Sequence, residues 1–123
     1  MKPTILVIED NEINMDMMIF VLNAMGLAVI PALNGPVGLA IAKSEIPNLI
    51  FCDIKMPHLD GYGVLDALRL DPKSANIPII AVTAIAIDED GARLLAAGFD
   101  GYLSKPIEFD HLKGELRKFL PNW

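Results

Sequence analysis

Short apolar runs alternate with longer helical patterns along the chain, and this alternation predicts the elements of the fold. Unbroken runs of β-branched and aliphatic residues are typical of strands that are buried on both faces of a sheet. Such runs occupy residues 4–8, 28–30, 49–52, 77–82 and 101–103. The patterns between them predict helices over residues 12–25, 35–44, 62–70, 88–97 and 108–120, with residues 57–61 as the loop before the third helix. Asn34 is placed as a helix cap with Pro36 in the first turn, and Gly26 and Gly98 each end a helix.

Five strands that alternate regularly with five helices predict an α/β fold with a parallel sheet covered by helices on both faces. The crossovers are expected to be right-handed. The 123 residues contain no linker, repeat or low-complexity tract, and they are expected to form a single domain, 1–123, without an effector domain.

Composition narrows the class of protein. Hydrophobic residues make up 53% of the chain, which excludes intrinsic disorder. A net charge of −6 without a basic cluster argues against nucleic-acid binding, and no apolar window is long enough to span a bilayer. The start of the chain lacks the long apolar stretch that is typical of a signal peptide, and the single cysteine, Cys52, excludes an intramolecular disulfide. A cytoplasmic location without membrane association is therefore expected.

The residues that carry chemistry lie directly after the predicted strands. Glu9 and Asp10 follow the first strand, Asp53 the third, Thr83 the fourth, and Lys105 lies just beyond the fifth. In an open α/β sheet, ligands bind outside the carboxyl ends of the strands. The sequence therefore predicts that three carboxylates, one hydroxyl and one ammonium group converge on one edge of the sheet.

This set of groups predicts a site for a cation and a phosphoryl group. Clustered carboxylates repel one another, and burial raises their pKa values unless a cation is present. Oxygen ligands suit a hard cation, so Mg²⁺ is the natural candidate. A lysine beside the metal would complete a cradle for a dianionic phosphoryl group, with Thr83 as a hydroxyl donor.

These residues resemble those of the receiver domains of two-component response regulators, and the resemblance covers essentially the whole chain. The matching elements occur in the family's order and spacing: Glu9-Asp10, Asp53-Ile54-Lys55-Met56-Pro57, Asp60-Gly61, Thr83-Ala84, Tyr102 and Lys105-Pro106. The resemblance implies a flavodoxin-like (βα)5 doubly wound sandwich with strand order 2-1-3-4-5. It extends to stand-alone receivers of the cell-fate and polar-differentiation type and to receivers fused to hybrid kinases.

The resemblance also implies roles for single residues. Asp53 would accept a phosphoryl group from a phosphohistidine on a histidine kinase or a histidine phosphotransfer protein. Mg²⁺ would be held by Glu9, Asp10, Asp53 and the backbone carbonyl of Lys55. The phosphoryl oxygens would meet Lys105, Thr83 and the Ala84 backbone N–H. Pro106 is expected to follow a cis peptide bond that aims Lys105 into the site, and Pro57 and Gly61 to have structural roles.

The expected output is a conformational switch that controls binding of a downstream protein, or onward transfer of the phosphoryl group in a phosphorelay. In the family, the threonine turns toward the phosphoryl group and the strand-five aromatic swings into the space it leaves; here these are Thr83 and Tyr102. Lys55 and Ile85 flank the expected line of water attack, and neither is a carboxylate or amide. Slow autodephosphorylation is therefore predicted.

Two surfaces are expected to contact partners. The first helix is more apolar than one buried stripe requires, so Met17 and Val21 are assigned to the core and a second stripe to docking of a kinase or phosphotransfer domain. The residues assigned to docking are Ile13, Met15, Ile19 and Leu22. The residues assigned to the output surface are Phe99, Tyr102, Ile107 and Phe109. The protein is expected to be a monomer or a phosphorylation-dependent dimer.

Two functions from other classes of protein, a phosphohydrolase and a flavin-binding protein, fit the sequence less well than a receiver domain. A Mg²⁺-dependent phosphohydrolase with an aspartate nucleophile would need a cap insertion and an acid–base aspartate where Lys55 stands. A flavin phosphate would be repelled by the carboxylates of residues 9–12. The chain is therefore expected not to be an enzyme, apart from its own phosphoryl uptake and hydrolysis.

Overall fold

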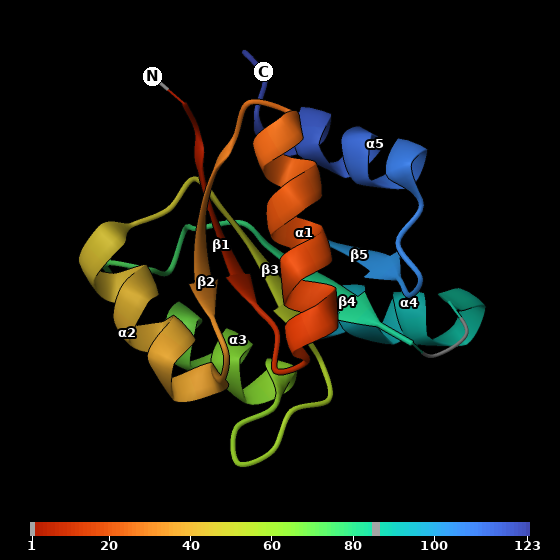
Figure 1. Cartoon of the computed structure of the whole chain (residues 1–123). Helices are drawn as coiled ribbons and strands as arrows, with labels where there is room; N and C mark the ends of the chain where they lie inside the picture. The colour runs from red at the N-terminus through yellow and green to blue at the C-terminus, as the bar shows by residue number, and fades with distance from the viewer. Residues whose placement is uncertain (1, 85–86) are drawn as a thin grey trace.

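Five parallel strands form one sheet in the computed structural model, which describes residues 2–84 and 87–123 (Figure 1). The strands are β1 (Thr4–Ile8), β2 (Ala28–Ala32), β3 (Leu49–Asp53), β4 (Ile79–Thr83) and β5 (Gly101–Ser104). Their spatial order is β2-β1-β3-β4-β5, and every neighbouring pair is parallel. The predicted flavodoxin-like topology is confirmed.

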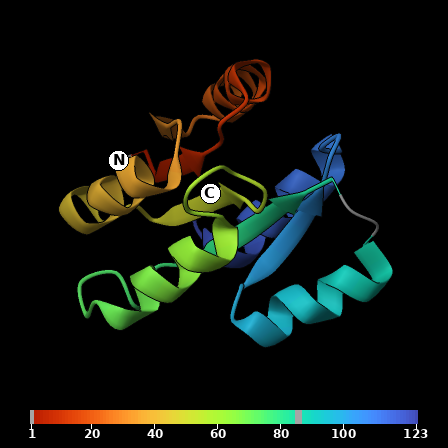
Figure 2. The same cartoon turned by 90° about the horizontal axis from the view of Figure 1, so that it is seen from below.

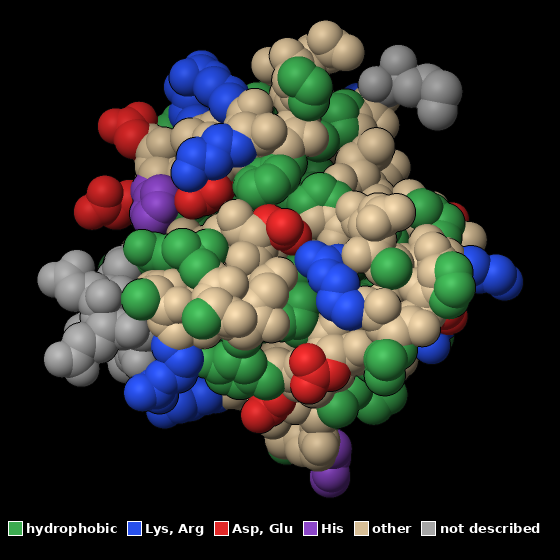
Figure 3. All heavy atoms as spheres, turned by 180° about the vertical axis from the view of Figure 1, so that it is seen from behind, with side chains coloured by type: hydrophobic (Ala, Val, Ile, Leu, Met, Phe, Trp, Pro, Cys, Tyr) green, Lys and Arg blue, Asp and Glu red, His purple; other side chains and the backbone are tan. Residues whose placement is uncertain are grey.

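Helices cover both faces of this sheet (Figures 1 and 2). They are α1 (Glu12–Ala24), α2 (Gly35–Glu45), α3 (Gly61–Leu70), α4 (Ile87–Ala97) and α5 (Phe109–Phe119). One apolar core lies between the sheet and α1 with α5, and the other lies between the sheet and α2, α3 and α4. In the described part of the chain, no helix has the length and apolar character to cross a membrane. On the face seen from behind, basic side chains are dispersed among acidic and hydrophobic ones (Figure 3).

Short polar side chains fix where three of the helices begin. The side chains of Asn11, Asn34 and Asp60 accept backbone N–H groups in the first turns of α1, α2 and α3, at 3.0, 2.8 and 2.9 Å. Each of these bonds satisfies an N–H that has no partner within its helix. The caps after β1 and β3 therefore hold the loops that carry the acidic residues.

The fourth strand begins and ends later than predicted. Arg69 donates to the Ile77 carbonyl at 2.8 Å and pairs with Asp100 at 2.9 Å, while Asp100 accepts the Ile79 N–H at 2.8 Å. These side-chain bonds hold the segment before Ile79, which lies outside the strand. At the other end β4 includes Thr83, which places the hydroxyl at the edge of the sheet.

Helix α1 buries a different face from the one predicted. Met15 and Leu22 were assigned to docking, yet they are only 3% and 0% exposed, and they pack in the core with Met18. Met17, assigned to the core, is 49% exposed, and Val21 is half-buried. Because the apolar residues of this helix extend beyond one stripe, their pattern does not mark the buried face, and the packing of the helix on the sheet decides it.

Phe99 also belongs to the core rather than to an output surface. It is 3% exposed and packs edge-on against Tyr62, with ring centroids 5.7 Å apart. The chain turns back at Gly98, whose φ is +118°, and the Phe99 N–H donates to the Leu94 carbonyl at 3.2 Å. This left-handed turn directs the ring inward, because glycine readily adopts such a conformation and ends the helix there.

Candidate functional site

Three carboxylates meet where β1 and β3 end. Ile8 pairs with Cys52 in the sheet, so the next residues, Glu9 and Asp53, lie side by side at its edge. Glu9 and Asp53 are buried and Asp10 is exposed, and their carboxylate oxygens lie within 4.8 Å of one another. The sequence prediction that these three side chains converge is met by this geometry.

Lys105 reaches the same site from the far side of β4. Thr83 pairs with Ser104, and the Lys105 N–H donates to the Thr83 carbonyl at 2.8 Å. The Lys105 Nζ lies 3.0 Å from Glu9 Oε2 and 3.3 Å from Asp53 Oδ2. The Lys105–Pro106 peptide bond is cis. One ammonium group thus contacts two of the three carboxylates.

Burial and mutual repulsion shape the charges of this cluster. Burial, followed by the neighbouring Glu9, raises the pKa of Asp53 from 3.8 to about 6, although Lys105 opposes the shift. For Lys105, burial favours the neutral amine, but the hydrogen bond to Glu9 and the charges of Asp53 and Glu9 outweigh it and raise the pKa. With its carboxyls ionised, the cluster carries three negative charges against one positive charge, and its donors are oxygens. Both features fit a hard divalent cation such as Mg²⁺.

Cys52 is buried in β3 and takes no part in the cluster. Burial, reinforced by the charge of Asp53, raises the pKa of its thiol above the ordinary value. Its Sγ donates to the Asp53 carbonyl oxygen at 3.3 Å. A thiol that stays protonated is neither a nucleophile nor a metal ligand, as expected for a core cysteine.

The loop after Asp53 is closed tightly by Gly61. The Gly61 N–H donates to the Ile54 carbonyl at 2.9 Å. A Cβ at this position would lie 2.8 Å from the Asp53 carbonyl oxygen and 2.9 Å from the Ile54 Cα. The Pro57 carbonyl accepts the Leu59 N–H at 2.8 Å. Gly61 therefore permits an approach of helix and strand that no other residue allows.

Thr83 and Tyr102 share one face of the sheet. Thr83 pairs with Ser104 and Ala81 with Tyr102, and alternate residues of a strand point to the same side. Thr83 is buried, and the Tyr102 ring is half-buried. A Cβ on Gly91 of α4 would come within 2.6 Å of the Tyr102 Cζ, so the ring packs on this glycine. Sequence reasoning missed Gly91, although a glycine inside a helix is itself a signal of close packing.

The remaining candidate residues differ in how close they lie to the acidic cluster. Asp53 pairs with Val82, so Thr83 and the exposed Ala84 lie beside the carboxylates, and the Lys55 side chain is exposed. Ile85, invoked for slow hydrolysis, lies outside the described residues. Ile107 is half-buried between α1 and α5.

Replacement of Asp53 by Asn is expected to stabilise the metal-free protein at neutral pH. The raised pKa means that the folded state binds more protons than the unfolded state between pH 3.8 and about 6, so the free energy of unfolding of the wild type falls as pH rises through this window. Asn lacks this titration. We expect Asp53→Asn to gain about 2 kcal/mol at pH 7 and little at pH 4, measured by denaturant unfolding in EDTA. An equal gain at both pH values would contradict the assigned cause.

Comparisons with known proteins agree with this arrangement. The family model for the response regulator receiver domain matches residues 5–117. The polar-differentiation response regulator DivK of Brucella anthropi is 34% identical over 120 residues, covering 98% of each chain. A solved receiver domain of a sensor histidine kinase from Pseudomonas aeruginosa, with a magnesium ion coordinated in its active-site cleft, has a TM-score of 0.89 and 30% identity over 99% of this chain and 100% of that chain. The chemotaxis protein CheY4 of Vibrio cholerae has a TM-score of 0.88 and 26% identity, with 98% and 100% of the two chains covered.

Proposed function

The chain belongs to the response regulator receiver domain family of two-component signalling, and on this basis we propose that it is a switch phosphorylated on Asp53. Receiver domains are signalling proteins. The observation that carries the proposal is the position of Lys105, whose Nζ contacts both Glu9 and Asp53 beside a third carboxylate. This arrangement suits the uptake of a dianionic group by a carboxylate.

In the proposed reaction, an Asp53 carboxylate oxygen attacks the phosphorus of a phosphohistidine on a histidine kinase or phosphotransfer protein. A phosphorus–oxygen bond forms, the phosphorus–nitrogen bond breaks, and the electron pair leaves with the imidazole. Lys105 holds Asp53 in place and pairs with the phosphoryl oxygens. Glu9, Asp10, Asp53 and the Lys55 carbonyl would hold Mg²⁺, which when bound neutralises phosphoryl charge.

The proposed switch couples the phosphoryl group to β5. The Thr83 hydroxyl and the Ala84 N–H would bind phosphoryl oxygens, and the reorientation of Thr83 would change the space available to Tyr102 on the same face. Support comes from the close packing of Tyr102 on Gly91, because a change in the position of this ring would alter the contact between β5 and α4.

The proposed docking surface for the phosphohistidine partner is the α1 face, defined here as Ile13, Met17 and Phe20. These residues are spaced by four and three positions, and Ile13 and Phe20 are 77% and 75% exposed. The helix begins two residues after Asp10, so the face starts beside the phosphoacceptor cluster. It replaces the predicted stripe, of which only Ile13 is fully exposed and Ile19 is half-buried.

Charge on the α1 face is expected to slow phosphotransfer from a protein donor only. In Ile13→Glu/Phe20→Glu, desolvation of the new carboxylates opposes docking, and we expect transfer from a phosphorylated histidine partner to slow at least about tenfold. Uptake from acetyl phosphate, which needs no docking, is expected to stay within about twofold of wild type. Leu70→Glu, at an 84% exposed position of α3, is the matched control. Equal rates of transfer from the protein donor in all three proteins would refute this surface.

A further inference from the structure

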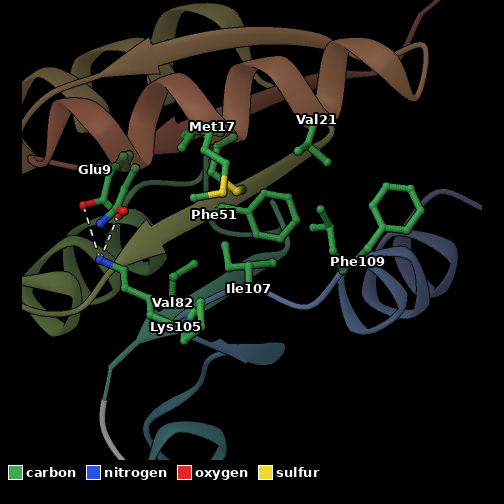
Figure 4. Close-up of a pocket in the computed structure, with 14 residues that line it drawn as sticks. Glu9, Met17, Val21, Phe51, Val82, Lys105, Ile107 and Phe109 are labelled. Carbon is green, nitrogen blue, oxygen red and sulfur yellow. Dashed lines mark hydrogen bonds and ion pairs between the residues drawn. The ribbon is translucent and has the colours of Figure 1, made fainter.

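A cavity of about 190 Å³ lies between α1 and the segment that joins β5 to α5. Its walls come from α1, the central strands and the start of α5, and Figure 4 shows Met17, Phe51, Ile107 and Phe109 around it. Met17 and Phe109 line the cavity and are also in contact with solvent, with exposed fractions of 49% and 54%.

The lining of this cavity is almost entirely apolar. Its polar side chains are Glu9, Asn14 and Lys105, and Figure 4 places Glu9 and Lys105 at one end. The two charged groups are paired with each other at 3.0 Å. Water in the apolar part would lack the two to four polar partners that hold a buried water, whereas an engineered apolar cavity of roughly 150 Å³ stays dry and binds benzene.

We propose that this cavity is a binding site for a small uncharged molecule with a single aromatic ring. Its size admits one ring, and the Met17 and Met18 thioethers and the Phe51 and Phe109 rings offer the sulfur–aromatic and ring–ring contacts that such a ligand favours. A charged ligand is disfavoured because the cavity has no unpaired countercharge and lies beside the acidic cluster.

Occupation of the cavity affects the α1 face, a consequence that rests on the proposed function. Met17 belongs both to that face and to the cavity wall. A bound ring therefore restricts a side chain that the phosphohistidine partner has to contact when it docks. Binding of the ligand and binding of the phosphohistidine partner are therefore coupled through Met17. Uptake of a phosphoryl group from acetyl phosphate needs no contact with the α1 face, so this effect of the ligand is specific to the protein donor.

The test is a titration of the full chain, labelled at the methionine methyl carbons, with fluorobenzene followed by NMR. We expect saturable ring-current shifts at Met17 and Met18, which line the cavity, and none at Met15, Met25 or Met56. Benzoate is expected to bind at least about tenfold more weakly. Absence of saturable shifts, or equal shifts at Met17, Met18 and the three methionines outside the cavity wall, would overturn the proposal.

Variants separate this site from non-specific binding and from the proposed function. Val21→Phe places a ring in the cavity and is expected to abolish binding, and Ile107→Phe is the second filling variant if the first does not fold. Val37→Phe, at an exposed position of α2, is expected to bind as wild type does. Undiminished binding by a folded filling variant would overturn the site. Phosphorylation from acetyl phosphate without ligand binding would refute this inference and leave the proposed function standing.

Discussion

Replacement of Lys105 by Met is expected to slow phosphoryl uptake from acetyl phosphate about 100-fold. The side chain keeps its approximate volume but loses the ammonium group that contacts Glu9 and Asp53 at 3.0 and 3.3 Å. Two buried carboxylates then lack their cation, so the free energy of unfolding in EDTA at pH 7 is expected to fall by about 2–3 kcal/mol. Because the cluster becomes more negative, Mg²⁺ is expected to bind more tightly and to restore most of this loss.

Lys73→Met is the matched control for this variant, because Lys73 is exposed in the loop before β4, whereas the cluster lies where the strands end. It is expected to leave uptake, stability and Mg²⁺ affinity unchanged. Intact-mass kinetics, denaturant unfolding and Mg²⁺ titration measure the three effects. Wild-type uptake kinetics in folded Lys105→Met would show that the ammonium group plays no part in phosphoryl transfer.

Replacement of Gly61 by Ala is expected to impair uptake to a similar extent by displacing Asp53. The added Cβ would lie 2.8 Å from the Asp53 carbonyl oxygen and 2.9 Å from the Ile54 Cα. Both are backbone atoms, so the clash is relieved only if the loop between β3 and α3 moves. We expect a loss of about 1–3 kcal/mol in the free energy of unfolding. Uptake is expected to slow by as much as about 100-fold, because a displacement of about 1 Å is costly for a group that has to be aligned.

Gly114→Ala provides the matched control, since a Cβ at Gly114 in the middle of α5 would meet no atom within 4 Å. Removal of a helical glycine in open space is expected to stabilise the protein by about 0.5–1 kcal/mol and to leave uptake unchanged. If the two alanine variants behave alike, tight packing at Gly61 is not what positions Asp53.

The positions of the charged site residues could be predicted from sequence because strand ends impose them. Once the apolar runs are taken as parallel strands, Glu9, Asp10, Asp53 and Lys105 have to emerge at one edge of the sheet. Asp53 itself forms the last residue of β3, one position beyond the apolar run. Backbone connectivity thus suffices for this part of the site, without knowledge of side-chain packing.

The faces of α1 and of the α4–β5 turn depend on packing, and here the sequence predictions were wrong. Met15 and Leu22 are as apolar as Met17, so the polarity of these side chains does not show which of them faces the sheet. Phe99 lies between the turn at Gly98 and strand β5. The backbone conformation of this turn determines whether the Phe99 ring points into the core or toward the surface. A glycine inside a helix signals close packing, but the sequence does not show that the partner of Gly91 is Tyr102, which approaches it from another element.

The most direct test of the central proposal is intact-mass spectrometry after incubation with acetyl phosphate, with and without Mg²⁺, for wild type and Asp53→Asn. We expect a single phosphoryl addition to the wild type that requires Mg²⁺ and none to the variant, because the proposal assigns the phosphoryl group to Asp53, whose carboxylate lies in the acidic cluster 3.3 Å from the Lys105 Nζ. An addition of equal size to folded Asp53→Asn would contradict the assignment of the phosphoacceptor. No addition to folded, Mg²⁺-bound wild type, either from acetyl phosphate or from a phosphohistidine partner, would contradict the proposal that this receiver is switched by phosphorylation.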